Sequence, residues 1–448
     1  MPPIPRTLLV ENGTLLSTAG EVSVRRNHSV LIEDGVITRV APSASMGRHA
    51  GRRVDARGGV VIPGLINAHT HFYSAFARGM PGIRPSHDFT GVLRNLWWRL
   101  DSALKTEDCY HSALLSLIDS IRHGTTTLVD HHASPGAVGG SLQAIARAVR
   151  EAGVRACLCY EVSDRDGKRV AREGLEENVH FIRHCQGNGG ASLQALFGLH
   201  ASFTLCDRTL RAAADLGHSL EVGFHIHAAE ALSDQDSTRR ASGKRVIERL
   251  QSFGILGKRS ITAHCVHVSP REIGLLAETG TAVVHNPQSN LNNAVGIARV
   301  IEMARRGVLV GLGTDAMTAN MLEEARVALW AQHEASKCPS AGFSEVAGAL
   351  FAGNAEIAGR IFGLRFGEIR PGCAGDLAIL DYDPPTPLTE ASALGHVLFG
   401  LSQAPVDTTI VDGRPLMVHR QLRLGIDEER VNARARELAK SLWRRIQK

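Results

Sequence analysis

The chain has 448 residues, of which 44% are hydrophobic and 21% charged, as in a globular protein of one large domain or two to three average ones. Its formal net charge is only +5 and it has no run of Lys and Arg, which argues against a nucleic-acid partner. No apolar run is long enough for a signal peptide or a membrane span, and the eight cysteines show no paired framework. We therefore expect a cytoplasmic, reduced protein with no membrane contact.

The elements change character near residue 60. Residues 1–58 alternate apolar and polar residues around Asn-Gly and Asp-Gly turns, which predicts short hairpin strands. Apolar, β-branched runs then alternate with helical patterns up to residue 365, which predicts a parallel sheet with helical crossovers. The eight runs are 60–71, 126–132, 155–161, 193–201, 220–230, 260–267, 281–287 and 308–315. Eight units predict a (β/α)₈ TIM-like barrel over residues 59–365, with a doubly wound open sheet as the alternative.

The strand-and-turn style returns from residue 366, in GEIRPGCAGDLAILDYD and TTIVDGRPLMVHRQLRL. We expect residues 1–58 and 366–448 to combine into one small β-sandwich domain beside the barrel. The last stretch, VNARARELAKSLWRRIQK, has apolar residues at helical spacing and predicts a terminal helix with a basic, solvated face.

Polar residues gather at the ends of the predicted barrel strands, where barrel enzymes place their active sites. His69 and His71 end the first run, and strand alternation turns both side chains to one side. The later runs contribute His225, His227, Glu230, His264 and Asp315. Imidazoles with a carboxylate suit zinc and also iron or other divalent first-row metals. The sequence therefore predicts a metal site of three His and one Asp with an open position for water. We expect His225 to be turned away from this site, although HIH repeats the spacing of HTH.

The motifs resemble those of the amidohydrolase superfamily over essentially the whole chain. They are HTH in VIPGLINAHTH, HxxE, HC, GTD and the late PGCAGDLAILD. The similarity is strongest to the cytosine deaminase-like, chlorohydrolase-like branch. HFYSAFARGM, NLWWRLD and DHHASP resemble the SsnA-type aminohydrolases, which are associated with selenium-dependent molybdenum hydroxylase systems. The resemblance implies a barrel with a β-sandwich made from both chain ends, and metal ligands at His69, His71, His227 and Asp315.

Glu230 and its neighbours predict the chemistry. A bound divalent ion lowers the pKa of its water from about 15.7 toward about 7 and so makes hydroxide available at neutral pH. Glu230 is expected to carry the water's proton to a ring nitrogen, His264 to orient the hydroxide or the developing oxyanion, and Asp315 to relay a second proton to the leaving amine. The alternative for Glu230 is a loop carboxylate that caps the next helix.

His200 bears on the number of metal ions. Two-metal members of the superfamily bridge their metals with a modified lysine at the fourth strand end, where this chain has His200 in FGLHASFT. We therefore expect one divalent ion, Zn²⁺ first and Fe²⁺ as the alternative. His200 is expected to bind substrate, with a purely structural histidine as the alternative.

Four further residues are candidates for substrate binding. Arg78 follows the first strand and can equally be a salt-bridged loop residue. His131 and His132 both end the second strand, and we assign His132 to the pocket, although alternation alone does not decide between them. Glu161 ends the third strand and has a surface carboxylate as its alternative. Trp97 is expected to form part of the pocket wall. Adjacent side chains point in different directions, so the alternative is that Trp97 or its neighbour Trp98 serves only in packing.

Glu230 also predicts the leaving group. Loss of an amine requires a proton whereas loss of chloride does not, so the retained Glu230 favours a hydrolytic deaminase that attacks the exocyclic amine of a purine- or pyrimidine-like ring. The alternatives are a chlorohydrolase, an amidohydrolase with another leaving group, and a non-catalytic homologue. The expected partner is a small-molecule substrate, and large barrel enzymes are often homo-oligomers.

Overall fold

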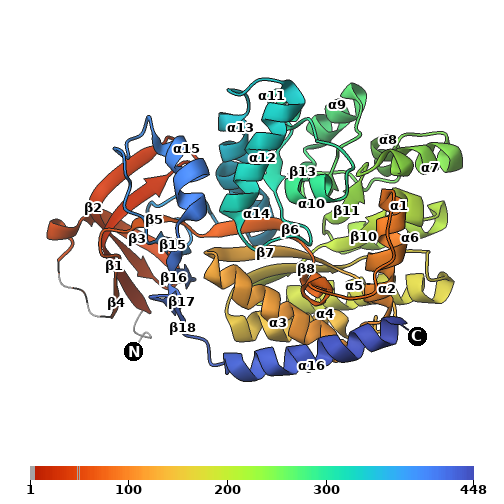
Figure 1. The fold of residues 1–448 in the computed structure, drawn as a ribbon, viewed down its shortest axis with the longest axis horizontal. Coiled ribbons are helices and arrows are strands. Elements are labelled where there is room, and N and C mark those ends of the chain that lie inside the picture. Colours follow the sequence, from red (N-terminus) through yellow and green to blue (C-terminus); the bar gives the residue numbers. More distant parts are fainter. Residues whose placement is uncertain (1–5, 48, 50, 448) are drawn as a thin grey trace.

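The computed structural model describes residues 6–47, 49 and 51–447. A β domain made from segments near both chain ends lies beside a larger barrel, and Figure 1 shows the red strands next to the blue strands on one side of the molecule, with the C-terminus on the other side. No helix in the described ranges is long and apolar enough to cross a membrane.

The barrel is closed and parallel. Its strands are β6 (Leu65–Thr70), β7 (Thr125–His132), β8 (Arg155–Tyr160), β10 (Phe197–Ala201), β11 (Phe224–Ala228), β12 (Ile261–His264), β13 (Ala282–His285) and β14 (Val310–Leu312). The short β9 (Leu193–Ala195) precedes β10 and pairs with β8. Parallel bridges Val162–Leu199 and Thr70–Asp315 join the two sheets into a ring. This confirms the predicted (β/α)₈ barrel and excludes the open sheet.

Helices surround the barrel and bury their apolar faces against it. The main ones are α3 (Thr106–Arg122), α4 (Ser141–Ala152), α5 (Lys168–Asn188), α6 (Asp207–Ser219), α7 (Leu232–Ser242), α8 (Val246–Ser252), α9 (Pro270–Thr279), α10 (Pro287–Asn292), α11 (Val300–Arg305), α12 (Met321–Ser336), α13 (Phe343–Gly348) and α14 (Asn354–Phe362). A capping box of Ser269 and Glu272, with Pro270 in the first turn, starts α9. Shorter segments are η1 (Ser43–Ser45), η4 (Ser202–Thr204), η5 (Ala349–Gly353), α15 (Ala393–Gly395), η6 (His396–Gly400) and η7 (Leu401–Gln403).

The loop between β6 and β7 is long and carries its own short helices. They are η2 (Phe72–Ala77), α1 (Phe89–Val92), η3 (Leu93–Trp97) and α2 (Trp98–Ser102). Several of their aromatic side chains face the mouth of the barrel, so this loop builds much of one wall of the pocket described below.

The β domain is one continuous nine-stranded sheet. Its strands are β1 (Thr7–Ser17), β2 (Ser23–Glu33), β3 (Val36–Pro42), β4 (Arg52–Asp55), β5 (Val60–Pro63), β15 (Leu377–Leu380), β16 (Val406–Val411), β17 (Arg414–Val418) and β18 (Gln421–Leu422). Antiparallel pairing of β5 with β15 joins the two chain ends, as expected. The predicted first barrel strand is thus divided, because its start belongs to this sheet. The break falls at Gly64, where a Cβ would lie 2.4 Å from Oγ1 of Thr126.

The terminal helix α16 (Glu428–Gln447) forms as predicted but packs on the barrel. Figure 1 shows it running beneath the barrel, beside α3 and away from the β domain. Leu438 and Leu442 are buried, and Nε1 of Trp443 donates to the carbonyl of Phe76 in η2 at 2.8 Å. This helix therefore supports the loop that follows His71.

A buried ion pair connects the two domains. Arg155, at the start of β8, is 2% exposed and lies 3.0 Å from Oδ2 of Asp376 and 3.0 Å from Oδ1 of Asp412. Asp376 directly precedes β15 and Asp412 lies in the turn between β16 and β17, so this guanidinium links the base of the barrel to the β domain.

Candidate metal centre and pocket

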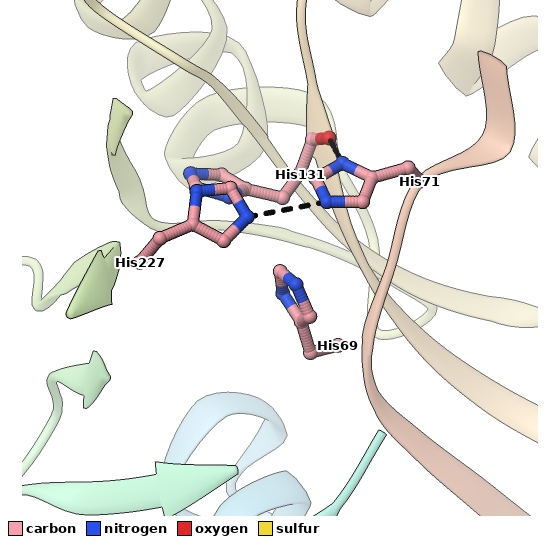
Figure 2. A group of neighbouring side chains, drawn as sticks. All are labelled: His69, His71, His131 and His227. Atoms are coloured by element: carbon pink, nitrogen blue, oxygen red, sulfur yellow. Dashed lines mark hydrogen bonds between the residues drawn. The ribbon is translucent and has the colours of Figure 1, made fainter. Parts of the chain in front are cut away.

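Four histidines from three barrel strands converge at the barrel mouth. They are His69 and His71 at the end of β6, His131 on β7 and His227 on β11, with one nitrogen of each ring within 4.8 Å of the others. Figure 2 shows the His69 ring pointing toward the space beside the rings of His71 and His227, with His131 behind. Nε2 of His71 lies 3.2 Å from Nε2 of His227. The spacing of HTH thus does bring both imidazoles to one point.

Asp315 completes this cluster from the end of β14. Its Oδ1 lies 3.0 Å from Nε2 of His71 and 4.0 Å from Nε2 of His69. Asp315 has a φ of 51°, and His264 at the end of β12 has a φ of 71°. Such left-handed conformations are costly for residues other than glycine and are concentrated at functional sites. Here both turn a strand end so that its side chain meets the cluster.

Each of the three histidines proposed as metal ligands has its Nδ1 engaged away from the cluster. Nδ1 of His71 bonds to the carbonyl of His131, and Nδ1 of His227 lies 2.9 Å from the carbonyl of His200. Nδ1 of His69 lies 2.9 Å from Nε2 of His225. Within the described part of the chain, the buried Nε2 of His69 has no hydrogen-bond partner. Histidine ligands are held in this way in metal sites, so the donor set fits a metal ion.

The electrostatics of His71 also suit a cation. Burial disfavours a charged ring, but the carboxylates of Asp315 and Glu161 outweigh it and raise the pKa of His71 to about 9. Burial likewise disfavours the Asp315 carboxylate, yet its hydrogen bond with His71 lowers the pKa of Asp315. The cluster therefore stabilises positive charge at a fully buried point.

Glu230 stands beside this cluster, just after β11. Its Oε2 lies 3.5 Å from Nε2 of His264, and its Oε1 accepts a hydrogen bond from Asn293 at 3.3 Å. Nδ1 of His264 donates to Oδ1 of Asn290 at 2.7 Å, which fixes the direction of the ring. Burial raises the pKa of Glu230 above its ordinary value. Among the described residues, Glu230 accepts no backbone N–H of α7, so helix capping does not account for its position. Asp234, in the first turn of α7, accepts the N–H of Ala229 at 2.7 Å and so holds the segment that carries Glu230.

A small pocket with a cavity volume of about 50 Å³ opens over these side chains. One set of lining residues is mostly apolar: Tyr73, Phe89, Leu93, Trp97, Trp98 and Phe203. The other is polar: Asp101, Glu161, Arg165, His200, Asp234 and Asn293. The lining therefore combines aromatic faces with polar groups, a combination that suits a flat ring with polar atoms on its edge.

The sequence model of the amidohydrolase family matches residues 60–416. The chain belongs to the amidohydrolase family. It is 30% identical to the 5-methylthioadenosine/S-adenosylhomocysteine deaminase of Pelotomaculum thermopropionicum over 98% of this chain and 99% of that relative. An adenosine deaminase of Xanthomonas campestris with bound zinc superposes with a TM-score of 0.87 at 25% identity, over 98% of this chain and 99% of the other. A triazine hydrolase of Arthrobacter aurescens shares the fold, with a TM-score of 0.83 at 23% identity over 97% and 99% of the two chains.

These relatives confirm the predicted family and its deaminase-like, chlorohydrolase-like branch. They do not bear on the association with selenium metabolism, which stays a prediction.

Three of the five predicted substrate-binding residues of this amidohydrolase line the pocket: His200, Glu161 and Trp97. The adjacent Trp98 lines it as well, so neither tryptophan serves in packing alone. Glu161 is no surface carboxylate: it lies 3.3 Å from Nδ1 of His71, and burial raises its pKa to about 8.

The other two predicted substrate-binding residues do not line this pocket. The Arg78 side chain is 78% exposed, lies 3.6 Å from Asp119 and borders a neighbouring cleft that His71 and Asp315 also line. His132 is buried outside the pocket, with Nε2 3.0 Å from Oγ of Ser134. Strand alternation turns its neighbour His131 to the metal cluster instead.

Sequence reasoning missed Arg165, Asp101 and the role of His225. Arg165 lies four residues after Glu161, and a basic residue in the loop after a barrel strand was the available signal. Asp101 ends NLWWRLD in a loop whose course only the structure shows. His225 is not turned outward as expected, but points into the barrel and contacts His69.

Proposed function

We propose that the protein is a metal-dependent hydrolytic deaminase that removes the exocyclic amine of a purine-like heterocycle. The observation that carries this proposal is Glu230, buried in the pocket within 3.5 Å of His264 and beside the cluster of His71, His227 and Asp315. A deaminase needs such a group to transfer protons, because an amine leaves only when protonated. The deaminase names of the relatives support the same reaction.

One metal ion is proposed to be held by His69, His71, His227 and Asp315. Three nitrogens and one carboxylate oxygen form a donor set that zinc favours, and we propose zinc, with iron as the alternative. A divalent ion in this position lowers the pKa of a water molecule so that the water becomes a nucleophile near neutral pH.

The proton transfers are assigned to three side chains. Glu230 takes the proton of the attacking water and gives it to a ring nitrogen of the substrate. His264, whose Nδ1–H is held by Asn290, directs Nε2 toward Glu230 and Asp315 and orients the attacking water. Asp315, whose Oδ2 accepts from Ser289 and lies 3.8 Å from His264, passes the second proton to the departing amine.

The pocket walls are proposed to orient the ring. Tyr73, Trp97 and Trp98 offer aromatic surface on which a flat heterocycle packs. His200 and Glu161 lie 3.8 Å apart on the same side and are placed to bind polar atoms of the ring edge.

The test is ammonia release by metal-loaded protein from aminopurines, aminopyrimidines, pterins and chlorotriazines. Glu230→Gln keeps the shape of the side chain but cannot accept the proton, so we expect kcat to fall by about 10²–10⁴-fold. Glu278→Gln, at an exposed position, is the matched control and should retain full activity. Undiminished ammonia release by Glu230→Gln contradicts the assignment, and release of chloride without ammonia establishes the chlorohydrolase alternative.

A cytoplasmic location, a homo-oligomeric state and a link to selenium metabolism stay predictions. Size-exclusion chromatography with light scattering tests the oligomeric state.

A further inference from the structure

Arg165 is the only lysine or arginine among the residues described as lining the pocket. It follows β8, and its side chain is 11% exposed. Nε donates to Asp166 at 2.8 Å, Nη2 donates to Asp101, and the guanidinium carbon lies 5.3 Å from the Trp98 ring centre. Two acids and one aromatic face therefore hold this guanidinium in a fixed orientation. Its remaining nitrogen, Nη1, has no hydrogen-bond partner in the described ranges.

The positive charge of Arg165 is already more than neutralised by its two carboxylate partners. Asp101 is almost fully buried and Asp166 about one quarter exposed, so two carboxylates face one guanidinium. Another anion brought against Arg165 would meet a surplus of negative charge, whereas a neutral oxygen that accepts a hydrogen bond would not. The free donor of Arg165 thus suits a carbonyl group better than a carboxylate or a phosphate.

A second unused donor lies next to the first. Nε1 of Trp98 is buried and has no hydrogen-bond partner among the described residues. The ring of Trp98 packs edge-on against His200, with their centres 6.4 Å apart. Buried polar atoms are nearly always hydrogen-bonded in folded proteins, so a buried N–H in the wall of a binding pocket points to a ligand acceptor. This observation is independent of the charge argument and lies on the same wall.

We propose that Arg165, together with Trp98, binds a neutral carbonyl oxygen of the substrate, so that the preferred substrates are aminated heterocycles that also carry a ring oxo group. The proposal rests on the deaminase function proposed above and specifies its substrate class. The two donors lie on the wall formed by α2 and the loop after β8, whereas Glu230 and Asp315 lie at the metal cluster. The pocket accordingly binds the ring at two places, one at the departing amine and one at the oxygen.

The experiment compares pairs of rings that differ by one carbonyl oxygen: guanine with 2-aminopurine, isoguanine with adenine, and cytosine with 4-aminopyrimidine. We expect kcat/KM for at least one oxo compound to exceed that of its partner by about 10–100-fold in the wild type, since the site loses a hydrogen bond to a charged donor when the oxygen is absent. In Arg165→Met that ratio should fall about tenfold or more, chiefly through KM, while the partner without oxygen changes less than about threefold.

Two further variants separate recognition from folding. Arg165→Lys keeps the charge but loses the planar fork, so it should restore only part of the ratio. Arg245→Met removes an arginine paired with the buried Glu272 outside the pocket, and it should leave the ratio unchanged. Thermal unfolding of each variant shows whether it is folded, and the wild-type comparison of ring pairs needs no variant at all.

Calorimetric titration of the same pairs makes the test independent of turnover. If the wild type binds the oxo compound more tightly and Arg165→Met does not, the proposal for Arg165 is supported. This holds even if no ring releases ammonia, because absence of ammonia release would refute only the deaminase function. Equal binding and turnover of both members of every pair overturn it. Equal losses for both members in a folded Arg165→Met also overturn it, because Arg165 would then only support the pocket wall.

Discussion

The tautomer of His69 follows from a chain of contacts beneath it. Nε2 of His225 lies 2.9 Å from Nδ1 of His69, Nδ1 of His225 lies 3.7 Å from Sγ of Cys159, and that sulfur lies 3.6 Å from the carbonyl of Asp130. A carbonyl only accepts, so the thiol donates to it and the sulfur accepts from His225. His225 then accepts from His69, whose proton is on Nδ1. This arrangement leaves the lone pair of Nε2 directed at the metal cluster.

His225→Phe should therefore weaken metal binding by about 10–100-fold, because Nδ1 of His69 loses its acceptor. His225→Gln, whose amide oxygen can accept the same hydrogen bond, should recover part of the affinity. Competition with a chelator measures the affinity without reference to turnover. Unchanged metal affinity in a folded His225→Phe protein would remove His225 from this role.

Asp130 makes the stability of the fold depend on pH. It is fully buried, its Oδ1 accepts from the N–H of Phe72 at 2.7 Å, and its Oδ2 has no partner in the described part of the chain. Burial raises the pKa of Asp130 from 3.8 to about 7. The folded state thus retains a proton that the unfolded state releases. Asp130 therefore lowers the free energy of unfolding progressively as pH rises from about 4 to about 7, and lowers it no further above about pH 7.

Asp130→Asn keeps the hydrogen bond with Phe72 and removes the charge. Relative to wild type, we expect the free energy of unfolding of the variant to increase by about 2–4 kcal/mol between pH 4.5 and pH 8. Urea unfolding at the two pH values measures this, with Asp215→Asn at an exposed position as the control. If wild type and Asp130→Asn respond to pH identically, Asp130 does not retain its proton in the folded state.

At the scale of elements, periodicity was sufficient to locate all eight barrel strands, because buried parallel strands are continuous β-branched runs. It did not reveal the division at Gly64, since that break depends on the approach of Thr126 and on pairing with β15, more than 300 residues away. The metal-ligand candidates were found for the same reason as the strands: they stand at strand ends. Arg165 and Asp101 were not, because the courses of their loops are set by long-range packing that local patterns do not encode.

Helix α16 makes a specific contribution to the site at this scale. Leu442 is fully buried, and the next residue, Trp443, bonds to η2. Leu442→Ala should lower the free energy of unfolding by about 2–5 kcal/mol through lost burial and the cavity it leaves. Urea unfolding compares it with Lys440→Ala on the exposed face of the same helix, which should change little. Equal stability of the two variants would mean that α16 does not pack on the barrel as described.

At the scale of the molecule, the ion pair of Arg155 with Asp376 and Asp412 links the barrel to the β domain. Arg155→Met leaves the buried Asp376 carboxylate without its cation and should lower the free energy of unfolding by about 3–5 kcal/mol. Arg6→Met removes a second, partly exposed partner of Asp412 and should lower the free energy of unfolding by less than about 1 kcal/mol. Calorimetric unfolding of the two variants measures the difference. Equal, small losses would show that this ion pair contributes little to the joining of the domains.

We propose above that Glu230 acts in hydrolysis together with one metal ion, which four side chains hold. This proposal is tested most directly by titrating zinc into chelator-treated protein and following ammonia release from the most reactive ring of the panel. We expect the rate to rise linearly and to level off at one equivalent of zinc per chain, and Glu230→Gln to bind the same equivalent but release almost no ammonia. Full ammonia release without metal, or a rate that rises until two equivalents are bound, would contradict it.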